Sequence, residues 1–159
     1  MARNLALIEA VERALRDSAD PDEAIRESVA AIHASCPQYD WTGVYLRNGT
    51  ELVLHSYLGR PSPHGRIPIG EGICGAAARE GRTILVPDVR RDRRYLACSP
   101  ETRSEIVVPI LRDGEVVGEI DIDSDDPEAF GADDRETLEE VARRLAPRLA
   151  GPPARGEGR

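Results

Sequence analysis

Apolar residues at helical spacing predict three long helices, two at the start of the chain and one near its end. The first is expected from Leu5 to about Asp17. The second begins at Asp20, which can cap it, and runs to about Ser35. The last covers residues 133–149. Its apolar face consists of Leu138, Val141, Leu145 and Leu149.

Between these helices, short apolar runs separated by turn residues predict strands. The turn signals Asn48-Gly49 and Asp113-Gly114 each join two runs into a hairpin. A short helix over 73–80 and an irregular loop over 88–101 complete this middle section. The expected strands are 41–46, 51–57, 66–69, 83–86, 105–111 and 116–124. Two hairpins and flanking helices indicate an α+β fold, with a central antiparallel sheet, the N- and C-terminal helices on one face and pocket loops on the other.

The length of 159 residues fits one domain, expected over 1–150, with 151–159 as a flexible tail. The net charge of −8 disfavours nucleic acid and anionic membranes as partners. No apolar stretch reaches the length of a membrane-spanning helix or resembles a signal peptide, so we expect a cytoplasmic protein. The three cysteines form no CxxC pair, which argues against a disulfide framework and a cysteine-only zinc site.

The strand 116–124 carries an unusual row of acids. Strict alternation places Val116, Gly118, Ile120 and Ile122 on one face. It places Val117, Glu119, Asp121 and Asp123 on the other. Such a face is either solvated or lines a cavity that binds a cationic group, such as the ammonium of an amino acid. Glu105, at the start of the neighbouring strand, favours the rim of a pocket.

Two cysteines and one histidine are candidates for chemistry. Cys98 lies in a polar loop before the acidic hairpin and is the better candidate nucleophile. Cys74 is near the N-terminus of the short helix, where the pKa of a thiol is usually lowered. Both cysteines could instead be small buried apolar residues. His64 could reach the pocket and contact a substrate. A metal site of His64, Cys74, Cys98 and Asp123 is a further alternative, but no ligand spacing supports it, so no metal is expected.

At these residues the sequence resembles the free methionine-(R)-sulfoxide reductases, which are single GAF domains. The resemblance extends from about Tyr39 to the last helix. The segments that carry it are Trp41-Thr42-Gly43-Val44-Tyr45-Leu46, Gly70-Glu71-Gly72-Ile73-Cys74-Gly75, Val86-Pro87-Asp88-Val89, Leu96-Ala97-Cys98, Arg103-Ser104-Glu105-Ile106-Val107-Val108-Pro109 and Gly118-Glu119-Ile120-Asp121-Ile122-Asp123-Ser124.

The resemblance implies a role for each of these residues. Cys98 falls where the family keeps its catalytic cysteine, whose thiolate attacks the sulfoxide sulfur and becomes a sulfenic acid. Glu105, Asp121 and Asp123 fall where carboxylates hold the substrate ammonium and assist protonation of the sulfoxide oxygen. The aromatic residues expected to line the pocket are Trp41 and Tyr45. The resemblance also implies no bound cofactor, an external thiol reductant such as thioredoxin, and, by analogy with other GAF domains, a homodimer.

The chain departs from the family in the loop 61–66, where a third cysteine normally resolves the sulfenic acid as a disulfide. Pro63 or His64 stands in its place. The sulfenic acid would then be resolved by Cys74 or by an external thiol. Alternatively, the chain is a non-catalytic GAF module that binds or senses a small amine in the same acidic pocket.

Overall fold

The computed structural model describes residues 4–96 and 99–149. Four α-helices and six strands make up most of this part of the chain. In chain order, the elements are α1 (Leu5–Asp17), α2 (Pro21–Ser35), β1 (Trp41–Asn48), β2 (Glu51–Leu58), β3 (Arg66–Pro68), α3 (Gly72–Glu80), β4 (Ile84–Val86), β5 (Ser104–Arg112), β6 (Glu115–Ser124) and α4 (Ala132–Leu145). Two 3₁₀ turns, Val89–Arg91 and Ala146–Arg148, follow β4 and α4.

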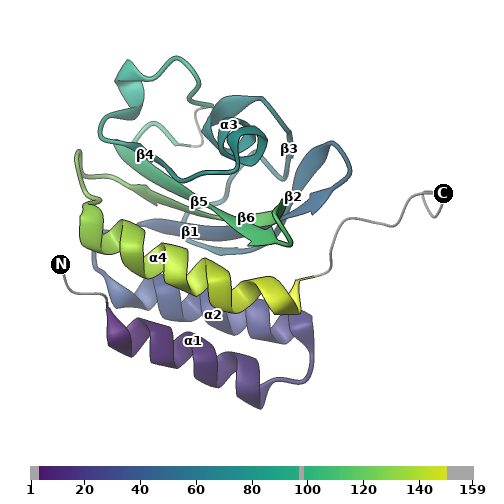
Figure 1. Ribbon diagram of the computed structural model, residues 1–159. Coiled ribbons are helices and arrows are strands. Elements are labelled where there is room, and N and C mark those ends of the chain that lie inside the picture. Colours follow the sequence, from purple (N-terminus) through teal and green to yellow (C-terminus); the bar gives the residue numbers. More distant parts are fainter. Residues whose placement is uncertain (1–3, 97–98, 150–159) are drawn as a thin grey trace.

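The strands form one sheet in the order β3-β2-β1-β6-β5-β4, and every neighbouring pair is antiparallel. Helices α1, α2 and α4 cover one face, whereas α3 and the connecting segments lie on the other (Figure 1). This arrangement confirms the expected α+β architecture. Strands β3 and β4, at the two edges, have three residues each.

The helix-covered face holds the larger apolar core. Helix α2 packs on β1 and β2, α4 packs on β5, and α1 packs against both helices. Side chains from β5 and β6 fill the space beneath them. The fully buried strand residues of this core are Val44, Ile106, Ile110, Ile120 and Ile122. The stability of the fold is therefore concentrated on this side.

The opposite face is covered by α3, which lies over β5 and β6 and contacts β3. Gly75 permits this position, because a Cβ at that residue would come within 2.6 Å of the carbonyl oxygen of Pro68. The amide of Gly70 also donates a hydrogen bond of 2.9 Å to the carbonyl of Gly75. These contacts fix the first turn of α3, which contains Cys74, against the sheet.

The hairpin between β5 and β6 is confirmed, with Arg112 opposite Glu115. Both turn residues, Asp113 (φ 52°) and Gly114 (φ 80°), have the left-handed backbone that a two-residue turn of this kind requires. Further along β6, the register shifts by one residue at Val117. This bulge places Val116 with the core beneath α3 and Val117 with the core beneath the long helices. The prediction from strict alternation is therefore wrong for these two valines, which lie on the opposite faces to those expected.

The last helix also differs from the prediction. Helix α4 ends at Leu145 rather than Leu149, and a 3₁₀ turn follows. Pro147 lacks the amide hydrogen that an α-helix needs and therefore ends it. The tail predicted over 151–159 lies outside the described residues. Among the helices that are described, none has the length and apolar character required to cross a membrane.

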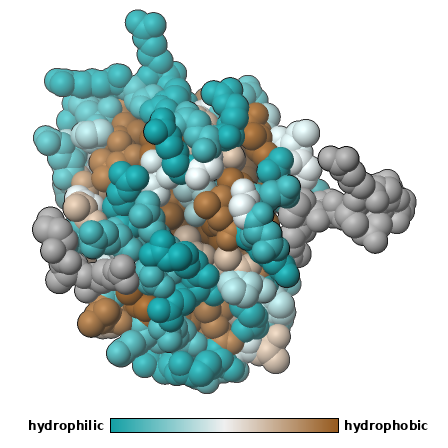
Figure 2. Space-filling view, in the orientation of Figure 1, coloured by the Kyte–Doolittle hydropathy of each residue, from teal (hydrophilic) through white to brown (hydrophobic). Residues whose placement is uncertain are grey.

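The surface on the side seen in Figure 1 is mostly hydrophilic, with apolar residues in small separate patches (Figure 2). The large apolar side chains that are exposed include Leu5, Tyr57, Leu58, Leu96 and Leu111.

Candidate functional site

Four carboxylates lie on the face of the sheet that α3 covers. In the register, Asp123 of β6 stands opposite Glu105 of β5, and Glu119 and Asp121 follow on the same face of β6. All four are buried, with exposed fractions between 0 % and 4 %. Among the described residues, no arginine or histidine is buried with them. The predicted row of acids is thus an enclosed acidic cluster and not a solvated face.

The burial of these acids disfavours their charged forms. Loss of solvent raises the pKa of Glu119 and of Asp123 well above the ordinary range, and the charge of Asp121 raises both further. Burial also raises the pKa of Asp121, although hydrogen bonds from Glu105 and Cys74 oppose this. Protons or an incoming cation are therefore needed to neutralise the cluster.

Cys74 lies directly above the cluster. Its thiol donates to Oδ2 of Asp121 at 3.3 Å. Burial, followed by the charges of Asp121, Glu119 and Glu105, raises the pKa of this thiol well above its usual value. The expectation that the helix N-terminus lowers this pKa is therefore wrong, because desolvation and three acids outweigh the helix dipole. Ligand atoms of Cys74, Glu105 and Asp121 all lie within 4.8 Å of one another, which suits a metal ion.

One narrow pocket brings together five of the residues singled out in the sequence. Its described lining includes Tyr45, His64, Cys74, Glu105 and Asp121. The remaining lining residues are Ile67, Glu71, Gly72, Ile73 and Leu96. The hydroxyl of Tyr45 donates to the backbone carbonyl of His64 at 2.9 Å, which joins β1 to the loop before β3. The volume open to the centre of a water molecule is about 10 Å³, enough for about one water.

Trp41 and Asp123 lie in the next row of the same face. They are opposite each other on β1 and β6, and neither belongs to the described lining of the pocket. The indole of Trp41 covers Gly43, where a Cβ would overlap the ring, and stacks on Tyr57 with ring centroids 5.6 Å apart. Its Nε1 is buried without a hydrogen-bond partner among the described residues.

Cys98, the predicted nucleophile, lies outside the described residues. Its neighbour Ser99 is described, and its hydroxyl accepts a hydrogen bond of 3.1 Å from Nε of Arg60. The same guanidinium donates through its Nη1 to Asp125, the residue directly after β6, at 3.0 Å. Arg60 therefore connects the loop that carries Cys98 to the strand that carries the acids.

Glu119 is the member of the cluster to which the sequence analysis assigned no role. It is fully buried, and neither carboxylate oxygen has a hydrogen-bond partner among the described residues. The sequence feature that could have assigned Glu119 to the cluster is its position two residues before Asp121, on the same face of a strand. Alternation alone did not reveal that α3 would cover that face.

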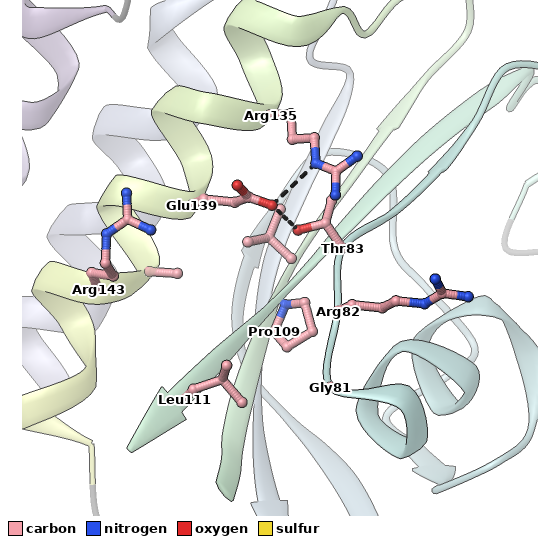
Figure 3. A pocket seen from close by; sticks show the side chains of 10 residues that line it. Gly81, Arg82, Thr83, Pro109, Leu111, Arg135, Glu139 and Arg143 are labelled. Carbon is pink, nitrogen blue, oxygen red and sulfur yellow. Dashed lines mark hydrogen bonds and ion pairs between the residues drawn. The ribbon is translucent and has the colours of Figure 1, made fainter. Parts of the chain in front are cut away.

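A second, larger cavity lies between α4 and the β4–β5 edge of the sheet (Figure 3). Its polar groups satisfy one another: Thr83 donates to Glu139 at 2.6 Å, and Arg135 pairs with the same carboxylate at 3.2 Å. Arg82 pairs with Glu80, and Arg143 with Glu140. Beneath α3, by contrast, both carboxylate oxygens of Glu119 and one oxygen each of Asp121 and Asp123 are buried without a hydrogen-bond partner among the described residues. The acidic pocket is therefore the candidate functional site.

Comparison with known proteins gives a consistent result. The GAF domain family matches residues 20–149. Protein YtsP of Bacillus subtilis is 34 % identical, over 91 % of this chain and 89 % of its own. The free methionine-R-sulfoxide reductase of Escherichia coli is 31 % identical, over 76 % of this chain and 73 % of its own. The structure of the free methionine-R-sulfoxide reductase of Neisseria meningitidis with its substrate superposes with a TM-score of 0.83 at 33 % identity, over 93 % of this chain and 92 % of that one.

Proposed function

Because the chain belongs to the GAF domain family and, within it, to the free methionine-R-sulfoxide reductases, we propose that it reduces free L-methionine-(R)-sulfoxide to methionine. The observation that carries this proposal is the enclosed acidic cluster beneath α3. A free amino acid carries an ammonium group, and four buried carboxylates without a described buried cation favour such a ligand.

Cys98 is proposed to be the nucleophile. Its thiolate attacks the sulfur of the sulfoxide, the sulfur–oxygen bond breaks, and the oxygen remains on the cysteine as a sulfenic acid. The substrate sulfur is thereby reduced by two electrons, and methionine leaves. The reaction needs a proton donor for the sulfoxide oxygen, and an acid kept neutral by burial suits that task.

Glu105, Asp121 and Asp123 are proposed to divide the binding and the protonation. Burial raises the pKa of Asp121 and of Asp123, so either retains a proton to a higher pH than an exposed aspartate does. When the substrate ammonium enters, it favours the charged carboxylates and releases that proton for the sulfoxide. Tyr45 and His64 line the pocket, and Trp41 closes the neighbouring row of the sheet face.

The sulfenic acid is proposed to be reduced by an external thiol such as thioredoxin. Two thiols return Cys98 to its reduced form, with release of water and formation of one disulfide. Cys74 is a poor internal donor, because burial among acids raises its pKa and lowers its thiolate fraction. A cytoplasmic location, expected from the sequence, and a homodimer, expected by analogy with other GAF domains, accompany this proposal.

The test is thioredoxin-coupled oxidation of NADPH with free L-methionine-(R)-sulfoxide, for the wild type, Cys98→Ser and Cys74→Ser. We expect turnover in the wild type, none in Cys98→Ser, and substantial turnover in Cys74→Ser. The (S) epimer of free methionine sulfoxide, and a peptide with blocked termini that contains methionine-(R)-sulfoxide, serve as controls and should react poorly. If the wild type shows no turnover with thioredoxin or dithiothreitol, the reductase proposal is wrong.

A second candidate is a non-catalytic module that binds a small amine. It is favoured by the absence of the third cysteine from the loop 61–66. Calorimetry with methionine, its sulfoxide and other amino acids distinguishes the two functions. Binding without turnover in both thiol systems would support the module, whereas turnover that depends on Cys98 would exclude it.

A further inference from the structure

The group formed by Cys74, Glu105 and Asp121 differs from an ordinary acidic cluster in three respects. It contains the thiol of Cys74 in addition to two carboxylates. It is buried, with exposed fractions of 5 % for Cys74, 4 % for Glu105 and 1 % for Asp121. Oδ1 of Asp121 has no hydrogen-bond partner among the described residues. A buried acceptor without a donor is costly, so the site favours a ligand that supplies positive charge.

The geometry fits a single ion. One ligand atom from each of these three residues lies within 4.8 Å of the others, which small side-chain movements can bring to bonding distance around one centre. In the pocket above them, the centre of a water molecule can occupy a volume of about 10 Å³. This is room for an ion or one water, and it is too small for an amino acid unless the pocket opens.

The ligand chemistry selects the kind of ion. Magnesium and calcium prefer oxygen ligands alone, whereas a thiolate with two carboxylates suits zinc and related thiophilic divalent ions. Three protein ligands leave a fourth position for water, as in zinc sites that are not fully closed. Coordination would replace the proton of the Cys74 thiol and any proton held by Glu105 or Asp121, so at least one proton passes to solvent for each ion bound.

We propose that the reduced protein binds a thiophilic divalent cation, such as Zn²⁺, through Cys74, Glu105 and Asp121, in competition with the ammonium of an amino-acid ligand. The ion occupies the carboxylates that the substrate needs and ties Cys74 to the sheet. Zinc thus inhibits binding of the amino-acid ligand to this pocket. Zinc binding itself does not depend on whether the chain is a reductase or a sensor.

The test uses Co²⁺ as a spectroscopic probe, added to the full-length reduced protein after removal of the reductant. A thiolate ligand gives cobalt a charge-transfer absorption that carboxylates alone do not give. We expect this band in the wild type and its displacement by Zn²⁺. We expect its loss in Cys74→Ser, and about tenfold weaker cobalt binding in Asp121→Asn and Glu105→Gln.

Three matched variants separate this site from other sources of the signal. Cys36→Ser and Cys98→Ser should keep the band, because neither cysteine belongs to the group. His64→Ala should also keep it, although His64 lines the same pocket. Circular dichroism must show that Cys74→Ser is folded. If Cys74→Ser is unfolded, the cobalt affinity of Glu105→Gln tests the site independently. A band that is absent from the wild type, persists in folded Cys74→Ser, or depends on Cys98 would overturn the proposal.

Competition connects the ion to the ligand. Increasing concentrations of methionine should weaken the apparent affinity for cobalt progressively. Acidification should also weaken cobalt binding, because the thiol then retains its proton. Failure of turnover with a normal cobalt band would contradict the proposed reductase function alone. Normal turnover without the band would contradict the metal site alone.

Discussion

Along β6, neighbouring residues meet two different environments. Ile120 and Ile122 point toward the long helices and belong to the larger apolar core. Glu119 and Asp121 point toward α3 and are equally buried, but as acids with no arginine or histidine buried among them in the described residues. One strand therefore serves a face that stabilises the fold and a face whose burial disfavours its own charged groups. The comparison indicates that the helix-covered face supplies the stability that lets the pocket keep desolvated acids.

The largest expected effect is on the helix-covered face. Ile122→Ala should lower the free energy of unfolding by about 2–5 kcal/mol, because Ile122 is 0 % exposed and its removal leaves a cavity. Asp121→Asn, one position away, should leave stability unchanged or raise it at pH 7. Urea unfolding of both variants measures the difference. Equal destabilisation of the two would show that the faces contribute alike.

Gly43→Ala should disturb the pocket side through packing. A Cβ at Gly43 would overlap the Trp41 ring, so the indole must move away from the sheet, at a cost of about 1–3 kcal/mol. Trp41 is the only tryptophan in the chain, so its fluorescence reports the movement directly. Gly65→Ala is the matched control, since a Cβ there meets no atom within 4 Å. Unchanged fluorescence in Gly43→Ala would contradict the close contact.

Arg60→Ala tests whether the acidic face depends on its connection to the Cys98 loop. Loss of the contacts with Ser99 and Asp125 should lower kcat/KM about tenfold, or about 1.4 kcal/mol. Stability should change by less than about 1 kcal/mol, because the side chain of Arg60 is 43 % exposed. Arg66→Ala, which removes an exposed pair with Glu51, is the control and should retain full activity. Equal losses in both variants would remove the special role of Arg60.

The smallest effect is the pH dependence that Glu119 gives to folding. Its pKa is raised by burial above the ordinary 4.5, so its favourable contribution is complete below pH 4.5 and is lost as the pH rises. Glu119→Gln should therefore match the wild type near pH 4 and be about 1 kcal/mol more stable at pH 8. Urea titrations at several pH values measure this. A stabilisation that is the same at both pH values would not come from ionisation of Glu119.

Much of the fold followed from local patterns. The hairpin at Asp113-Gly114 depends on two positive φ angles that few other residue pairs accept, and the start of α2 depends on Asp20 and Pro21. These signals are short-range, so the sequence contains them in full. Pro147 was an equally local signal, and the prediction of a helix through Leu149 overlooked it.

The site required information that no local pattern holds. The resemblance and the alternation along β6 pointed to Asp121 and Asp123, but the raised pKa of Cys74 depends on how α3 packs over a distant strand. The bulge at Val117 likewise depends on pairing with β5. Trp41 was predicted to line the pocket, and only the sheet register shows that it lies beside Asp123, one row away.

The sheet ends at two very short strands. Strand pairing between separate molecules needs a long, unpaired backbone edge, and β3 and β4 each offer only three residues for it. During synthesis or after heating, another polypeptide chain can therefore form few backbone hydrogen bonds with β3 or β4. Short edge strands thus disfavour aggregation through β3 and β4.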